Sequence, residues 1–238
     1  MLSCSGDPQN YAPVSNGWYP SASEKNRHTV QKGETLYAIA WRYDLDYRIL
    51  ASRNHLAPPY TLKTGQTLFV DPNQKRILEP TPPPQKIAPV KQYVRSEKPN
   101  PQPIAHVESS PVSGSAWIWP AEGKIVASYA PWMGRKGLDI SGNLGSPIRA
   151  AGSGVVAYSG DGLRGYGNLI IIKHNNAFLS AYAHNQKNLV KEGQSVQAGQ
   201  IIAEMGKSES KTVGLHFEIR KAGKPVNPLM YVKPKVLA

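Results

Sequence analysis

The sequence LRGYGNLIIIKHNNAFLSAYAHN, residues 163–185, indicates how the larger part of the chain folds. It holds two short strand-like segments, 167–175 and 178–185. Segments of the same kind lie on either side of it, namely GKIVASYA (123–130), PIRAAGSGVVAYSG (147–160), SVQAGQIIAEMG (195–206) and VGLHFEIRKAG (213–223). Short alternating segments separated by glycine-centred turns are typical of antiparallel sheets. No helical period of 12 or more residues interrupts them, so the sequence predicts a mostly antiparallel β domain over residues 117–238.

The composition of the whole chain excludes several classes of protein. Its 238 residues suffice for one large domain or two small ones. No stretch approaches the roughly 20 apolar residues that cross a bilayer. The single cysteine, Cys4, excludes an internal disulfide and Cys-rich zinc modules. Any metal site would therefore have to use histidines and carboxylates.

The charge of the chain is unevenly distributed. Residues 117–238 carry 15 Lys and Arg against 7 Asp and Glu, which is +8 of the total net charge of +12. A basic surface indicates either an anionic partner or simply a soluble domain with a cationic face. Aromatic stacking platforms and a recognisable nucleic-acid motif are absent from the sequence, so we expect no nucleic-acid partner.

Proline marks the boundary between two parts of the chain. Ten of the 21 prolines fall between residues 72 and 111. Proline lacks a backbone donor and fixes φ, which favours extended polyproline conformations over a packed domain. We therefore interpret residues 71–116 as a Pro-rich linker; the alternative is a recognition site for proline-binding modules.

The N-terminal residues 1–27 are rich in Ser, Pro, Gly and Asn and lack periodicity, which predicts a flexible tether. Cys4, with Leu2 and Ser3 before it and Gly6 shortly after it, looks like the end of a bacterial lipoprotein signal, in which the cysteine carries the lipid anchor. The apolar run that normally precedes such a cysteine is missing. Cys4 is thus either a lipid anchor whose true start lies upstream or an ordinary free thiol.

Residues 28–70 predict a small α+β domain with the order strand, helix, helix, strand (βααβ). Thr29 and Val30 suit a short strand, and residues 67–70 suit a second one. Thr35 can cap a first helix, whose apolar residues recur at i, i+3, i+4 and i+7 as Leu36, Ile39, Ala40 and Tyr43. Asp46 can cap a second helix, which must end before Pro58 and Pro59.

This segment, with TVQKGETLYAIAWRY at one end and LKTGQTLFV at the other, closely resembles the LysM module. The resemblance implies binding of the N-acetylglucosamine-containing glycan of peptidoglycan, in a shallow groove between two strand–helix loops. The implied contact positions are Gly33, Glu34, Thr35 and Leu36 in the first loop, and Asn54, Leu56, Ala57 and Pro58 in the second. For Leu36 and Leu56 the alternative is that they only fill the small core.

The histidines of the larger domain raise the question of a zinc site, which needs about three protein ligands and an open position for water. Period-two alternation places Tyr182 and His184 on one face of their strand. In GLHFEI it places Gly214, His216 and Glu218 on a polar face opposite Leu215, Phe217 and Ile219. A lone histidine on a strand is more often a surface or hydrogen-bonded residue than a metal ligand.

Together KGLDIS, GYGNLIIIKH, AYAHN and LHFEI resemble the lysostaphin/LytM-type zinc metallopeptidase domain, which cuts peptide cross-links of peptidoglycan. The resemblance implies Asp139 and His216 as zinc ligands and His184 as a histidine that assists catalysis. Arg135 stands where the family has a further histidine ligand, and Gly214 stands where it has a catalytic histidine. Arginine stays protonated and cannot donate a lone pair. We therefore predict no metal, no cofactor, a vestigial His184 and no peptidase activity.

The combination of LysM module, Pro-rich linker and ligand-deficient LytM domain closely resembles the NlpD-type lipoproteins of Gram-negative bacteria. The resemblance implies a periplasmic protein at the inner face of the outer membrane. There it would bind peptidoglycan and activate a periplasmic N-acetylmuramoyl-L-alanine amidase during septal splitting and daughter-cell separation. The partner groove would comprise Arg135, Asp139, His184, Gly214 and His216. The alternatives are an active zinc endopeptidase and a wall-binding scaffold lipoprotein.

Arg135 is the residue for which we have a specific hypothesis. It either offers its guanidinium to a carboxylate of the partner or pairs internally with Asp139.

Overall fold

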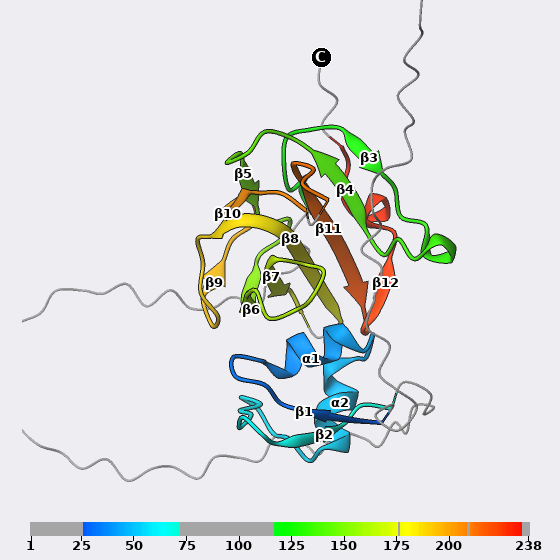
Figure 1. The fold of residues 1–238 in the computed structure, drawn as a ribbon, viewed down its shortest axis with the longest axis vertical. Helices are drawn as coiled ribbons and strands as arrows, with labels where there is room; N and C mark the ends of the chain where they lie inside the picture. The colour runs from blue at the N-terminus through cyan, green and yellow to red at the C-terminus, as the bar shows by residue number, and fades with distance from the viewer. Residues whose placement is uncertain (1–25, 72–116, 176, 209, 235–238) are drawn as a thin grey trace, which may run out of the picture.

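The computed structural model describes residues 26–71, 117–175, 177–208 and 210–234 (Figure 1). Cys4, most of the predicted tether and nearly all of the Pro-rich linker lie outside these residues, so the predictions made for them stay predictions. Within the described ranges, no helix is both long enough and apolar enough to span a membrane.

The small domain has the predicted order of elements. They are β1 (Arg27–Thr29), α1 (Leu36–Arg42), α2 (Tyr47–Arg53) and β2 (Thr67–Phe69). Both predicted helix caps are present: the hydroxyl of Thr35 accepts from the Ala38 amide at 3.1 Å, and the carboxylate of Asp46 accepts from the Arg48 amide at 2.9 Å. Such caps satisfy backbone donors that the first turn of a helix leaves without partners.

The larger domain is built on one 10-stranded sheet, and every strand pairing in the described part of the chain is antiparallel. The strands are β3 (Ile125–Ala127), β4 (Leu138–Ser141), β5 (Pro147–Arg149), β6 (Gly154–Gly160), β7 (Asn168–Lys173), β8 (Phe178–Asn188), β9 (Ser195–Val196), β10 (Ile201–Met205), β11 (Gly214–Lys221) and β12 (Lys224–Val226). Two short 3-10 helices complete it, η1 (Pro131–Met133) and η2 (Pro228–Met230). The predicted fold class is confirmed.

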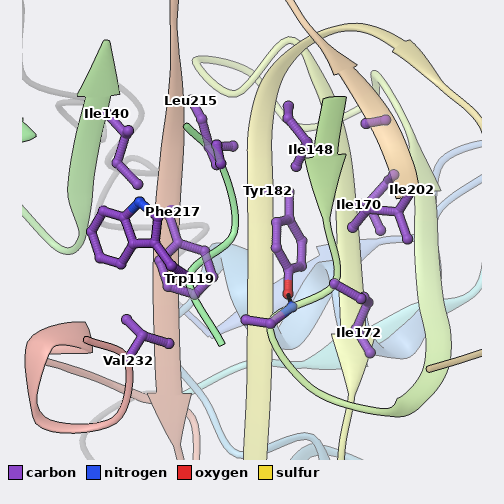
Figure 2. Packing of buried hydrophobic residues seen from close by; sticks show 14 of the residues in the cluster. Trp119, Ile140, Ile148, Ile170, Ile172, Tyr182, Ile202, Leu215, Phe217 and Val232 are labelled. Carbon is purple, nitrogen blue, oxygen red and sulfur yellow. Dashed lines mark hydrogen bonds between the residues drawn. The ribbon is translucent and has the colours of Figure 1, made fainter. Parts of the chain in front are cut away.

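The sheet follows the order β3-β4-β11-β8-β7-β6-β9, with β10 bridging β5 and β8 and with β12 beside β11. One of its faces packs into the main core of the domain, where Figure 2 shows Tyr182 between Ile148 and Ile170, with Phe217 beside Trp119. The buried hydroxyl of Tyr182 accepts from the amide of Ala151 at 2.7 Å. The opposite face of β11 carries the polar residues predicted from its alternation.

One prediction from alternation is wrong. His184 does not share a face with Tyr182, because β8 has a bulge at this point: Asn185 pairs with Asn168 and Tyr182 with Ile170, which leaves two residues of β8 opposite one of β7. His184 has a left-handed φ of 64°. A bulge of this kind redirects the side chain that follows it. Tyr182 therefore points into the core, while His184 lies with its ring centroid 5.9 Å from that of His216.

The two domains are in contact. Figure 1 shows α1 between the small β1–β2 sheet and the large β domain. Ala38 and Trp41 of α1 belong to the same buried cluster as Tyr166, Ala181 and Ala183 of the larger domain. The helix therefore lies on the face of the large sheet that carries the polar residues of β11, opposite the main core.

A candidate groove centred on His216

Two neighbouring strands bring the predicted site residues together. In the register of β4 and β11, His216 stands opposite Asp139, and Gly214 stands opposite Ser141. His184 reaches the same place from β8 because of the bulge described above. Thus Asp139, His184, Gly214 and His216 meet at one position on the sheet, although they are separated by up to 77 residues in sequence.

His216 is held between two carboxylates. Its Nδ1 lies 2.6 Å from Oδ1 of Asp139, and its Nε2 lies 3.1 Å from Oε1 of Glu218. A carboxylate at each ring nitrogen requires both nitrogens to carry a proton, since an ionised carboxylate only accepts. The imidazole is therefore an imidazolium that donates in two directions.

The electrostatics of this pair agree with that geometry. Burial alone would lower the pKa of His216, but the hydrogen bonds and charges of Asp139 and Glu218 outweigh it and raise this pKa to about 9. Burial would raise the pKa of Glu218, yet the Arg220 guanidinium and His216 lower it to about 2. Both groups are charged at neutral pH.

The Glu218 carboxylate is the centre of a larger polar network. The hydroxyl of Tyr166 donates to Oε1 of Glu218 at 2.9 Å, and Nε of Arg220 donates to Oε2 at 3.0 Å. Glu218 is 0% exposed and Arg220 is 1% exposed. A buried carboxylate with this set of partners is a fixed element of the fold.

Gly214 is enclosed by backbone. A Cβ built at this position would lie 2.8 Å from the carbonyl oxygen of Ile140, on the paired strand β4. Real Cβ atoms essentially never come this close to another heavy atom. The strands therefore approach each other at a distance that favours glycine, and a histidine side chain at residue 214 does not fit the backbone as it stands.

Arg135 lies at the end of the β3–β4 connection, where it forms an isolated bridge with Ala130 around η1. Its side chain is partly exposed. Among the described residues there is no ion pair between Arg135 and Asp139, and Asp139 pairs with His216 instead. The internal pairing that the sequence left open is thus not the one observed.

His184 and Asp139 line a small cavity beside the His216 network. The cavity has a volume of about 30 Å³, and its wall includes the hydroxyl residues Ser208, Ser210 and Thr212. That volume admits roughly one water molecule. The imidazole of His184 lies 3.3 Å from the carbonyl oxygen of Gly165, to which Nε2 donates.

The residues present do not fit a catalytic zinc ion. His216 uses both ring nitrogens on carboxylates, Arg135 carries a permanent positive charge, and Gly214 leaves no room for a histidine. In the part of the chain that the structure describes, no group of three or more His, Cys, Asp or Glu is placed to hold a metal. His174 is remote from the site: it contacts Ser153 and Ser180, and burial lowers its pKa to about 4.

The predicted glycan positions of the small domain have mixed environments. Leu36 is 1% exposed and belongs to the core, which favours the alternative that the sequence left open for it. Asn54 caps α2 and holds β2, accepting from the Phe69 amide at 2.8 Å. The Glu34 carboxylate bonds to His28 and lies near Arg42. Burial raises the pKa of Glu34, but these partners lower it below its usual value.

The second predicted loop is more open. His55, Ala57 and Pro58 are exposed, and Leu56 is half-buried against the small core. In the first loop, Gly33 is exposed, whereas the Thr35 hydroxyl donates to the carbonyl oxygen of Ala157 in the larger domain at 3.2 Å. One edge of the predicted glycan surface thus adjoins the domain interface.

Glu218, Tyr166 and Arg220 belong to the site but were not among the predicted residues. The alternation of β11 contained a signal for two of them, because Gly214, His216, Glu218 and Arg220 follow one another at period two on the same face. Tyr166 lies in the β6–β7 connection. Its hydroxyl bonds to Glu218, 52 residues further along the chain, and no local sequence pattern predicts so distant a contact.

Comparisons with known proteins agree with the two-domain interpretation. The LysM domain family matches residues 28–71, and peptidase family M23 matches residues 133–228. A Pseudomonas aeruginosa protein called "Lipoprotein NlpD/LppB homolog" is 40% identical over 268 residues, covering 98% of this chain and 88% of that protein. The Escherichia coli K12 protein "Murein hydrolase activator NlpD" is 38% identical over 273 residues, covering 94% of this chain and 71% of that protein.

Among solved structures, the antimicrobial peptidase lysostaphin from Staphylococcus simulans is 28% identical to the chain. The match covers 47% of this chain and 52% of that one, with a TM-score of 0.43.

Proposed function

The chain belongs to the NlpD/LppB family, and on that premise we propose that it is a non-enzymatic activator of a murein hydrolase. The hydrolase it serves would be a periplasmic N-acetylmuramoyl-L-alanine amidase. The LysM domain would bind peptidoglycan, and the M23 domain would bind the amidase. Several relatives carry the name "Murein hydrolase activator NlpD".

The observation that carries this proposal is the state of His216. In a metallopeptidase this imidazole would have to be neutral, with one nitrogen free for the metal. Here each ring nitrogen faces a carboxylate, Nδ1 at 2.6 Å from Asp139 and Nε2 at 3.1 Å from Glu218. The strand pair that would build a catalytic centre builds a buried ion-pair network instead. Together with the activator relatives, this supports a binding role for the M23 domain.

Activation has an energetic requirement. To move an amidase from almost wholly inactive to almost wholly active, the M23 domain must favour the active form by on the order of 5 kcal/mol. Only contacts that exist in that form alone can supply the difference. Arg135 suits such a contact, because its side chain is partly exposed and its guanidinium can hold a carboxylate with two hydrogen bonds.

The location follows from the same relatives. Several are named lipoproteins, and one from Histophilus somni is named an outer membrane antigenic lipoprotein. We propose that this protein is periplasmic in a Gram-negative bacterium and associated with the outer membrane. Lipidation of Cys4 would attach it to the inner face of that membrane.

The experiment is a release assay with dye-labelled peptidoglycan and the cognate amidase. Amidase with the protein should release dye several-fold faster than amidase alone, and the protein alone should release none. Release by the protein alone, together with stoichiometric tightly bound zinc, would identify an active endopeptidase. An unchanged rate with the amidase would favour the wall-binding scaffold.

A charge reversal tests the role of Arg135. Arg135→Glu should abolish the stimulation, because a carboxylate would repel the carboxylate that Arg135 is proposed to hold. Lys191→Glu is a matched control, since Lys191 is exposed in the β8–β9 connection and the charge change is the same. Full stimulation by Arg135→Glu would eliminate this contact.

A further inference from the structure

Helix α1 is apolar on two sides, and each side belongs to a different domain. Leu36, Ile39 and Ala40 lie in the core cluster of the LysM domain. Ala38 and Trp41 lie in a separate cluster, whose other fully buried members all come from the M23 domain. Trp41 is 2% exposed and Ala38 is 1% exposed. The M23 domain therefore supplies the cover for the second face of the helix.

The surface that receives α1 is continuous with the groove. Ala181 and Ala183 of β8 belong to the same buried cluster as Ala38 and Trp41 of the helix and as Tyr166. Tyr166 in turn makes an edge contact with His216, with ring centroids 6.1 Å apart, and bonds to Glu218. Helix α1 thus covers Tyr166, and Tyr166 covers His216. One end of the groove face is occupied by the LysM domain.

Polar contacts fix this position. The Arg220 guanidinium lies 3.6 Å from the ring centroid of Trp41, and its Nη1 donates to the Trp41 carbonyl oxygen at 2.7 Å. The same Nη1 lies 2.9 Å from Oδ1 of Asp44. Lys136, the neighbour of Arg135, lies 2.6 Å from Oδ2 of Asp44. The network that begins at Asp139 and His216 continues through Glu218 and Arg220 into the LysM domain.

From these contacts we infer that the LysM domain is a lid in cis on the M23 groove. The inference rests on the proposed function, since what the lid excludes is the amidase. When α1 is seated, the floor formed by Ala181, Tyr166 and Glu218 is buried and closed to a partner. A partner that uses this floor binds only the open fraction of molecules, so its apparent affinity falls by that fraction.

A glycine at the interface allows the lid to be tested with a single methyl group. Gly223 lies in the β11–β12 turn with a φ of +78°, and a Cβ there would meet the backbone of Leu45 and Asp46 in the LysM domain at 2.3 Å. The three heavy atoms nearest to this Cβ all belong to the LysM domain. Gly223→Ala should therefore lift α1 while the M23 domain stays folded.

The matched control is Gly193→Ala. Gly193 has nearly the same backbone conformation, with a φ of +82°, and a Cβ there has no atom within 4 Å. Both substitutions carry the strain of a left-handed alanine, but only Gly223→Ala adds the clash with the LysM domain. A difference between the two variants therefore reports the interface alone.

The first measurement is independent of the amidase. Ala38→Cys, in a Cys4→Ser background, places a thiol under the M23 domain, and its reaction with a maleimide reports exposure of that face of α1. Labelling should be slow in the parent and in Gly193→Ala, and at least tenfold faster in Gly223→Ala. Fast labelling of the parent would show that α1 is not seated. If Gly223→Ala labels slowly, Trp41→Ala serves as the second variant, and slow labelling of both would overturn the inference.

The second measurement is amidase stimulation by the full chain, without the added cysteine. Gly223→Ala should reach half-maximal stimulation at a severalfold lower concentration than the parent and Gly193→Ala. Equal or weaker stimulation by Gly223→Ala, with labelling accelerated, would overturn the lid. Absence of stimulation by all three chains would refute the proposed function instead, and the labelling would still decide whether α1 is seated.

Discussion

Removing Trp41 should open the domain interface and leave both domains folded. Trp41 packs against the M23 domain rather than in the LysM core, so Trp41→Ala removes contacts that only the docked chain makes. A buried tryptophan covers about 150–250 Å², and at about 25 cal/mol per Å² this corresponds to roughly 4–6 kcal/mol of transfer free energy. Alanine keeps part of that area, and Trp→Ala in cores costs about 3–5 kcal/mol.

The backbone contact survives the change, since Arg220 donates to the carbonyl oxygen of Trp41. The stacking of the guanidinium on the indole is lost too; its share, about 1–2 kcal/mol for a buried pair, is counted within that range. Taking about 3–4 kcal/mol for the net effect, the docking equilibrium should shift toward the open form by roughly 100- to 1,000-fold. The labelling rate of Ala38→Cys should rise by the same factor until the interface is fully open.

Trp132→Ala is the control for this substitution. Trp132 lies in η1 and is 81% exposed, so its removal should not change the labelling rate. Thermal unfolding followed by circular dichroism should show that the secondary structure of both variants is intact. An increase of less than fivefold for Trp41→Ala, in a chain whose parent labels slowly, would refute the reasoning that places the docking energy in this side chain.

Three further changes test the buried network. Gly214→His should not create zinc binding and should lower stability by about 1–3 kcal/mol, because its Cβ meets the Ile140 carbonyl; metal analysis and thermal unfolding measure both, and stoichiometric zinc would contradict the expectation. The folded-state pKa of His216, about 9, exceeds the ordinary value of 6.5, so its contribution, up to about 3 kcal/mol, is complete below pH 6.5 and is lost as the pH rises through 9. Denaturant unfolding at pH 6 and pH 9.5 should show a larger loss for the parent than for His216→Gln, and equal losses would show that another group is responsible. Glu218→Ala leaves Arg220 and His216 buried without their shared carboxylate, which should destabilise the chain by about 3–5 kcal/mol in the same measurement at pH 7; a loss below 1 kcal/mol would mean that water or another group replaces the carboxylate.

Sequence patterns predicted well those features that depend on residues close together in the chain. Thr35 and Asp46 cap the helices for which they were predicted, because a cap depends on residues two or three positions away. The polar face of β11 follows from alternation within one strand. His184 was placed on the wrong face because a bulge depends on how β8 pairs with β7, and that pairing involves residues far apart in the sequence.

The sequence predicted which residues lie close together better than it predicted their hydrogen-bond partners. Asp139, His184, Gly214 and His216 do meet, but no sequence pattern indicated that Glu218 would bind the second nitrogen of His216. That contact depends on side-chain geometry within the sheet. It holds His216 in a fixed ion pair, which Arg135 and Gly214 alone do not predict.

The sequence of α1 contains a signal for a second apolar face, formed by Ala38 and Trp41, which helical periodicity alone did not reveal. Leu36, Ile39 and Ala40 form one apolar stripe, and Ala38 and Trp41 form a second, so a helix that is apolar on two sides must be covered on both. The surface that covers Trp41 combines this apolar contact with Arg220 and Glu218, which are themselves fully buried. Buried charges give little net stability, because their desolvation offsets much of their attraction. The docked state therefore depends mainly on Trp41 and its apolar neighbours, and a partner that competes for the same floor can release it.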